Sequence, residues 1–315
     1  MKPAILLIGT NGQVGRALST MLPRIGEVTA LDRQRLDLTQ PEEIRRAIHN
    51  FHPAFIMNAA AYTAVDKAES EENVARAVNA EAPAVMAEEA KKIGASLIHF
   101  STDYVFDGSK TSPYDEDDPA NPRNVYGRTK LEGERAIQAS GAAHLIFRTA
   151  WVYATQGRNF LLTILRLATQ REELRIVRDQ IGAPTLNTEI AGATTKILAQ
   201  ICDAEGGPFS LPDVSGIYHM TAGGETSWHG FTEAILEEAA QTPVICPWFA
   251  SATNNLPLIA RRVIPITTNE YPTPARRPSY SVLSNSRLDR TFSLQLPHWQ
   301  RQLHSVFANP PAKIP

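Results

Sequence analysis

The stretch Gly9-Thr10-Asn11-Gly12-Gln13-Val14-Gly15 follows a short apolar run, Ile5–Ile8, and opens an amphipathic stretch over Val14–Leu22. Three glycines in a turn from a strand into a helix let the backbone approach a pyrophosphate and let the helix pack closely on the strand. The helix N-terminus then offers free N–H groups and a partial positive charge to phosphate. The motif therefore predicts a dinucleotide-binding turn.

The alternation that begins at this turn continues through the first half of the chain. Further strands are expected at Val28–Leu31, Phe55–Met57, Leu97–Phe100 and Leu145–Phe147, and helices between them at Pro41–Phe51, Glu72–Ile93 and Val125–Ala139. Thr39 is the expected N-cap of the first of these helices, and Gly94 is expected to end the second. Strands that alternate with helices predict an α/β fold with a Rossmann-like, doubly wound parallel sheet, which binds ligands beyond the carboxyl ends of its strands.

The pattern loosens after about residue 150. Helical stretches are expected at 160–169, 189–200 and 228–240, and proline-rich loops near 208–212, 265–278 and 309–315. We expect residues 1–150 to form the dinucleotide-binding domain. Residues 151–315 are expected to form mainly a smaller α/β substrate-binding domain, with some segments returning to the sheet. The acidic run Asp115–Asp118 is expected to be a solvated loop.

Composition narrows the classes of function. The 315 residues are 43% hydrophobic and 20% charged, which is ordinary for a globular protein. A net charge of −2 gives no electrostatic footprint for nucleic acid or an anionic membrane. No apolar run approaches the ~20 residues that span a bilayer. Two cysteines, Cys202 and Cys246, are too few for a disulfide framework, so we expect a cytoplasmic protein.

The residues after the second and third strands are candidates for holding a dinucleotide. Asp32 ends the second strand, where a carboxylate binds ribose hydroxyls and repels a 2′-phosphate. Arg33 and Arg35 follow, and guanidinium groups bind phosphate well. The carboxylate favours NADH and the arginines favour NADPH, so we expect a protein that prefers NADPH and can also use NADH. The alternative for both arginines is that they lie on a solvated surface. The small side chains of Asn58-Ala59-Ala60-Ala61 would allow close approach of the cofactor, or form a simple loop.

A catalytic group is predicted at the next strand and helix. Ser101-Thr102-Asp103 follows the fourth strand, and Tyr126 and Lys130 lie four residues apart on one helix face. A free tyrosine has a pKa near ~10, and a nearby ammonium would lower that pKa by favouring the phenolate. Lys130 would also hold the nicotinamide ribose, Thr102 would orient a substrate carbonyl, and Tyr126 would protonate the developing alkoxide. The alternative is a solvated helix surface.

At these residues the chain resembles the extended short-chain dehydrogenase/reductase superfamily and, within it, the dTDP-4-dehydrorhamnose reductase family. The resemblance covers most of the chain and is carried by residues 9–15, 58–69, 101–106, 124–130, 147–153, 179–185 and 271–278. The glycine turn and the Tyr/Lys pair specify only the superfamily, whereas the last three stretches point to the reductases. The resemblance implies NADPH-dependent reduction of the 4-keto group of dTDP-4-dehydro-L-rhamnose to dTDP-L-rhamnose, a precursor of cell-surface polysaccharide.

The resemblance also implies roles for individual residues. Thr102, Tyr126 and Lys130 would be catalytic, while Thr102, Asp103 and Trp151 would face the sugar, although Trp151 could also be plain core. Arg276, in the proline-rigidified Arg276-Arg277 loop, could bind the nucleotide diphosphate or simply be solvated. The implied cofactor-binding residues are Gly9, Gly12, Gln13, Val14, Gly15, Asp32, Arg33, Asp37, Leu38, Ala61, Tyr62, Thr63, Tyr126 and Lys130.

Several questions stay open at this point. Some relatives use carboxylates near the glycine turn for a Mg²⁺-linked dimer, but Arg16 and Ala17 follow Gly15 here, so no metal ligand is assigned. Mg²⁺ dependence and the choice between monomer and homodimer therefore remain undecided. Two other functions are considered: a nucleotide-sugar epimerase or dehydratase, and a regulatory subunit that binds NADP(H) without turnover. A dehydratase would need an acid/base pair beside Thr102, where Asp103 and Tyr104 stand instead.

Overall fold

A six-stranded sheet, parallel at every pairing, forms the centre of the computed structural model, which describes residues 2–202, 210–241 and 246–308. The strands run in the order β10-β5-β4-β3-β1-β2. Five of them are the predicted strands, and the doubly wound α/β fold is confirmed. The sheet strands are β1 (Ala4–Ile8), β2 (Glu27–Leu31), β3 (Phe55–Asn58), β4 (Ser96–Thr102), β5 (His144–Thr149) and β10 (Gly216–His219).

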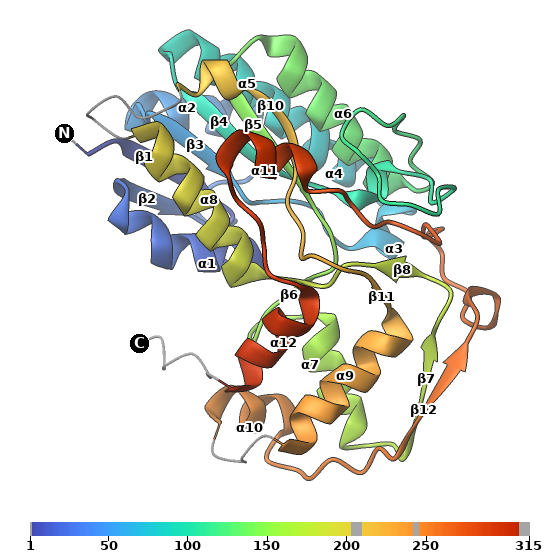
Figure 1. The fold of residues 1–315 in the computed structure, drawn as a ribbon. Coiled ribbons are helices and arrows are strands. Elements are labelled where there is room, and N and C mark those ends of the chain that lie inside the picture. The colour runs from blue at the N-terminus through green and yellow to red at the C-terminus, as the bar shows by residue number, and fades with distance from the viewer. Residues whose placement is uncertain (1, 203–209, 242–245, 309–315) are drawn as a thin grey trace.

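Helices cover both faces of this sheet (Figure 1). On one face α1 packs against α8, and the core there includes Leu18, Ile190 and Phe292. On the other face α5 packs against α2 and α6, around Ile44, Met86 and other apolar side chains. The helices of these layers are α1 (Gln13–Met21), α2 (Pro41–Phe51), α3 (Val65–Ala68), α4 (Glu72–Arg76), α5 (Ala82–Ile93), α6 (Val125–Ser140), α8 (Asn187–Cys202) and α11 (Ser286–Phe292).

The rest of the second half forms a smaller lobe with its own apolar core, seen in the lower part of Figure 1. Short strands pair there two by two, and β10, α8 and α11 return from the second half to the large sheet. The lobe's elements are β6 (Val152–Tyr153), α7 (Phe160–Ala168), β7 (Glu173–Val177), β8 (Ile181–Gly182), β9 (Thr185–Leu186), β11 (Thr226–Ser227), α9 (Trp228–Gln241), α10 (Pro247–Thr253), β12 (Arg262–Ile266) and α12 (Trp299–Ala308). The predicted loop at 309–315, and residues 208–209 of another, lie outside the described residues.

Two local predictions were wrong. Gln40, not Thr39, is the N-cap of α2, because a residue before proline is held in the extended region that an N-cap requires. The Thr39 hydroxyl donates to Asp37 instead. The acidic run is only partly solvated, since Glu116 is buried and accepts a hydrogen bond from the His219 N–H at 2.9 Å. The run therefore secures the end of β10.

The single helix predicted over Glu72–Ile93 is interrupted. Between α4 and α5 the chain widens into a π-helical turn, Ala77–Glu81. Pro83 has no N–H to offer the carbonyl one turn earlier, that of Asn79, and this removes a bond that would keep the turn α-helical. The turn directs the buried Asn79 side chain toward the sheet edge described below.

Candidate active site

The glycine turn allows three backbone segments to meet. Gly9 has φ = +89°, and a Cβ there would lie 2.6 Å from the Ala60 nitrogen at the end of β3. A Cβ on Gly15 would lie 2.1 Å from the Gly9 carbonyl oxygen. The glycines therefore seat α1 against the turn and bring the turn against the loop after β3, as a dinucleotide cradle requires.

We expect Gly15→Ala to distort this cradle. The added methyl group meets backbone rather than a flexible side chain, so the free energy of unfolding should fall by about 1–3 kcal/mol. NADPH binding, measured by titration calorimetry, should weaken as well because α1 is displaced. Gly192→Ala in α8 is the matched control, since nothing lies within 4 Å of its Cβ, and it should gain about 0.5–1 kcal/mol from helix propensity. Unchanged NADPH affinity in the Gly15 variant would contradict this role for the turn.

A cleft of about 1680 Å³ opens beside the turn. It brings together residues from the ends of β1, β2 and β3, the start of α6 and the smaller lobe. Gly15 and Lys130 are not in its lining: Gly15 is buried against Gly9, and Lys130 is buried. The predicted cofactor residues that line it are Gly9, Gly12, Gln13, Val14, Asp32, Arg33, Asp37, Leu38, Ala61, Tyr62, Thr63 and Tyr126.

Buried polar atoms at the cleft have no protein partner within the described part of the chain. Gln13 Oε1 and Thr149 Oγ1 belong to this group, and both residues line the cleft. An unsatisfied buried polar atom costs free energy unless a ligand or water completes it. Together with the glycine cradle, these atoms show that the site fits a dinucleotide.

The structure separates the two arginines that follow β2. Arg33 lines the cleft with its side chain exposed, whereas Arg35 donates from Nη1 to the Ala30 carbonyl at 3.3 Å. Asp32 holds this turn, accepting from the backbone of Gln34 at 3.0 Å and from Asn11 Nδ2 at 3.1 Å. Of the two arginines, Arg33 is thus the one placed where a 2′-phosphate could meet it.

Thr102 and Tyr126 lie together at the carboxyl end of β4. The Thr102 hydroxyl donates to Asp103 Oδ1 at 3.0 Å and accepts from the Tyr104 N–H at 3.1 Å. Burial raises the pKa of Tyr126 to about 12, and a hydrogen bond with Thr102 offsets part of that rise. The predicted lowering of the pKa of Tyr126 is therefore wrong, because burial of the phenol raises that pKa. Tyr126 stays a protonated phenol at neutral pH.

Lys130 is buried one helical turn beyond Tyr126. Its Nζ lies 2.9 Å from His99 Nε2 and donates to the Phe100 carbonyl at 2.6 Å. Burial lowers the pKa of Lys130 to about 8, against the opposite influence of Glu134. These contacts were not predicted, because His99 lies inside a strand that the sequence pattern marks only as apolar.

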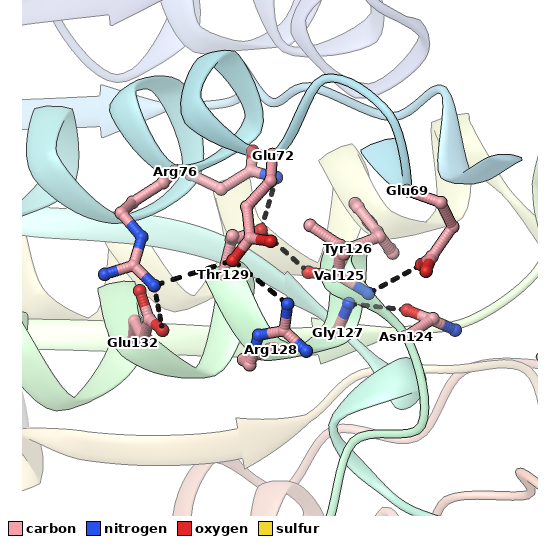
Figure 2. Close-up of polar contacts among 11 residues, drawn as sticks. Glu69, Glu72, Arg76, Asn124, Val125, Tyr126, Gly127, Arg128, Thr129 and Glu132 are labelled. Carbon is pink, nitrogen blue, oxygen red and sulfur yellow. Dashed lines mark hydrogen bonds and ion pairs between the residues drawn. The ribbon is translucent and has the colours of Figure 1, made fainter. Parts of the chain in front are cut away.

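The N-terminus of α6, which carries the tyrosine, is fixed by side chains from other elements (Figure 2). Asn124 is its N-cap and accepts from the Gly127 N–H at 2.8 Å, while Glu69 accepts from the Val125 N–H at 2.8 Å. Arg128 pairs with Glu72 of α4. Two of the four free N–H groups at this end are thereby satisfied, and α6 is tied to α4 and to the end of α3.

Asn79 of the π-helical turn provides a further link that sequence reasoning missed. Its Oδ1 accepts from the Tyr62 N–H at 2.8 Å, and its Nδ2 donates to Thr129 Oγ1 at 3.2 Å. Tyr62 belongs to the cleft lining and Thr129 to α6. The sequence signal that could have found it is Pro83, because proline inside a helix disrupts the local pattern.

The predicted sugar-facing residues Thr102, Asp103 and Trp151 are not among the residues that line the cleft. Burial raises the pKa of Asp103 to about 6, against hydrogen bonds from Ser281 and Thr102 that lower it. Trp151 has a strained φ of +47° and stacks on Trp228, with ring centroids 3.4 Å apart. A Cβ on Gly182 would lie 2.4 Å from the Trp151 ring, which accounts for a glycine there.

The two arginines of the proline-rich loop differ in their surroundings. Arg277 pairs with Asp66 at 2.8 Å, which ties this loop to α3, a helix that closely follows the cleft-lining residues Ala61, Tyr62 and Thr63. Arg276 leaves its side chain exposed, and its carbonyl accepts from Asn124 Nδ2 at 2.7 Å. Arg276 is therefore available to a ligand, whereas Arg277 is already engaged.

Among the described residues, no group of three or more His, Cys, Asp or Glu side chains could hold a metal ion. Likewise, the described helices include none with the length and apolar character needed to traverse a bilayer.

Comparisons with known proteins agree with this geometry. The family model of the RmlD substrate binding domain matches residues 1–310. A dTDP-4-dehydrorhamnose reductase of Burkholderia thailandensis is 47% identical over 297 residues, covering 94% of this chain and 95% of the relative. One from Escherichia coli K12 is 41% identical over 311 residues, covering 96% and 98%. The crystal structure of the Bacillus anthracis dTDP-4-dehydrorhamnose reductase in complex with NADP has a TM-score of 0.85 at 31% identity, covering 98% of this chain and 99% of that one.

Proposed function

The chain belongs to the family of the RmlD substrate binding domain, and from that premise we propose that it is a dTDP-4-dehydrorhamnose reductase. Its reaction is the NADPH-dependent reduction of the 4-keto group of dTDP-4-dehydro-L-rhamnose to dTDP-L-rhamnose. The observation that carries the proposal is the hydrogen bond between the buried Thr102 hydroxyl and the phenol of Tyr126, which lines the cleft beside the glycine turn. The relatives from Burkholderia thailandensis and Escherichia coli K12, which match over nearly the full chain, bear that enzyme's name.

In the proposed mechanism the protein's own groups bind and protonate the ketone. When bound, NADPH supplies the hydride that reaches the carbonyl carbon. Thr102 orients the carbonyl oxygen, and Tyr126 delivers its proton to that oxygen as negative charge develops there. The raised pKa of Tyr126 keeps the proton in place until it is needed. Loss of this proton leaves Tyr126 as a phenolate. Lys130, one turn further on α6, stabilises that phenolate when the lysine is in its ammonium form.

The residues that would hold the two ligands follow from their positions. The Gly9–Gly15 turn takes the pyrophosphate, and Arg33 at the cleft favours a 2′-phosphate, with NADH usable because Asp32 is close by. Asp103 and Trp151 take the sugar, and the exposed Arg276 takes the nucleotide diphosphate. We further propose residues 1–150 as the cofactor domain and most of 151–315 as the substrate domain.

The finer setting of the enzyme is part of the same proposal. We place it in the cytoplasm, which the two free cysteines support, and propose that it is a monomer or a homodimer. No Mg²⁺ ligand is assigned, because Arg16 follows the glycine turn and donates to Gln156 Oε1 at 2.9 Å. The epimerase or dehydratase function is less well supported, since Asp103 and Tyr104 occupy the place of a dehydratase acid/base pair.

The decisive experiment is an absorbance assay at the nicotinamide band. Purified protein with dTDP-4-dehydro-L-rhamnose is expected to oxidise NADPH stoichiometrically and release free NADP⁺. The same assay with NADH gives the cofactor preference. Conversion of the sugar without net NADPH oxidation would favour an epimerase or dehydratase. Tight NADPH binding, no turnover and a stoichiometric protein partner in a pull-down would favour a regulatory subunit.

A further inference from the structure

A chain of buried polar side chains connects the loop after β3 (residues 59–64, here called the cofactor loop) to Lys130. The Ala60 N–H donates to Asn58 Oδ1 at 3.2 Å, and Asn58 Nδ2 lies 3.0 Å from His99 Nδ1. On the other side of the ring, His99 Nε2 lies 2.9 Å from Lys130 Nζ. Asn58 and His99 are cross-strand partners in the β3–β4 register, and both are fully buried. Ala60 lines the cleft.

The direction of each hydrogen bond follows from its neighbour. Because the Ala60 N–H is a donor, Asn58 faces it with its oxygen and must face His99 with its NH₂ group. His99 Nδ1 therefore accepts. Burial and the nearby Lys130 hold the pKa of His99 well below its usual value, so the ring is neutral and carries one proton. That proton is on Nε2 and is directed at Lys130.

A proton donor facing Lys130 has a consequence for its charge. An ammonium has three N–H donors and no acceptor, whereas a neutral amine has a lone pair that accepts from His99 Nε2–H and still donates to the Phe100 carbonyl. Protonating Lys130 would require the other tautomer of His99 and a rotation of the Asn58 amide. The Ala60 N–H would then lose its acceptor. The arrangement as it stands satisfies every group only when Lys130 is neutral.

We propose that His99 and Asn58 are positioning residues that favour the neutral form of Lys130 and link its protonation to the backbone of the cofactor loop at Ala60. The consequence for turnover rests on the function proposed above, but the tautomer of His99 does not. A pKa of about 8 for Lys130 agrees with a site that disfavours its charge.

Lys130 has further charged or titratable neighbours on its own helix α6 and on the adjacent strand β4. Glu134 lies one turn further on α6 and raises the pKa of Lys130, while itself paired with Arg148 of β5. Tyr126 lies one turn before it, and His99 and Asp103 come from β4 and the residue just after it. From β3 comes Asn58, which does not titrate. Of these titratable groups, His99 is the one with a hydrogen bond to Nζ among the described residues, so its removal should change the titration of Lys130 most directly.

The expected change has a definite sign. Turnover needs charged Lys130 beside the developing phenolate, so activity falls as pH rises through the pKa of Lys130. His99→Gln places an amide near the same point, and its oxygen can accept from the ammonium. The pKa of Lys130 should therefore rise, and the alkaline limb of the kcat profile should move up by about one pH unit. His99→Phe is the matched variant, similar in size but unable to accept.

Two measurements test the proposal. In the first, pH profiles of kcat are compared for wild type, His99→Gln and His99→Phe. An upward shift with Gln that is absent with Phe supports the proposal, and an equal loss of activity at all pH values in both overturns it. In the second, ¹⁵N-histidine spectra of the unchanged protein, with the His99 signals assigned by their absence in His99→Gln or His99→Phe, report its tautomer. At a pH above the pKa of Lys130, protonated Nε2 with bare Nδ1 is expected. The reverse tautomer or an imidazolium at that pH overturns the proposal, even if one of the two variants does not fold or no turnover is found.

Discussion

Replacing Tyr126 with phenylalanine is expected to lower kcat for ketone reduction by about 10²–10⁴-fold, the usual contribution of a positioned general acid. The ring would still pack against Tyr104, whose centroid lies 5.6 Å away, so the fold and the cleft should persist. NADPH affinity should stay within a few-fold of wild type, because the change removes one hydroxyl from the lining. Stopped-flow absorbance and titration calorimetry measure the two quantities separately.

Tyr153→Phe is the matched control for this prediction. The Tyr153 hydroxyl is buried without a hydrogen-bond partner among the described residues, and its ring packs in the core of the smaller lobe. Its removal should leave kcat unchanged, since the residue does not line the cleft. Full activity of Tyr126→Phe, with the control also active, would exclude Tyr126 as the proton donor.

Arg148→Met is expected to cause the largest loss of stability, about 3–5 kcal/mol of unfolding free energy. Arg148 and Glu134 are both buried, and Arg148 binds the carboxylate through Nε at 3.0 Å and Nη2 at 2.6 Å. Ser101, the β4 register partner of Arg148, donates to the same carboxylate at 2.5 Å. Methionine would fill the volume but leave Glu134 as a buried charge with one hydroxyl partner. Urea denaturation followed by circular dichroism measures the loss.

A double variant separates the charge from the packing. Arg148→Met/Glu134→Leu removes both charges, and such a replacement of a buried pair is often neutral or better, so it should recover much of the loss. Arg46→Met on the exposed side of α2 controls for loss of a surface arginine and should lie within about 0.5 kcal/mol of wild type. A double variant as unstable as Arg148→Met would show that the cost is one of shape rather than charge.

The pair Tyr126 and Lys130 illustrates how far local sequence reasoning reaches. Four-residue spacing on one helix was enough to place both side chains on the same face, and the glycine turn was enough to place that helix in a dinucleotide-binding fold. The four-residue spacing did not reveal that Lys130 would contact His99. It also did not reveal that burial would raise the pKa of Tyr126 rather than lower it. Burial depends on the elements that cover a residue, which spacing alone does not report.

The sequence itself determined three features: the strands of the first half, the glycine turn and the helix face that carries Tyr126. Each of them depends on a hydrophobic period or on a glycine backbone conformation that involves only a few neighbouring residues. The partners of the buried polar groups were decided only by tertiary structure. Asn58 meets His99, and Ser101 meets Arg148, because of strand register, and β10 joins β5 from far along the chain. Pairings of this kind arise from the packing of distant segments, where burial makes an unpartnered polar group costly and so selects the contacts.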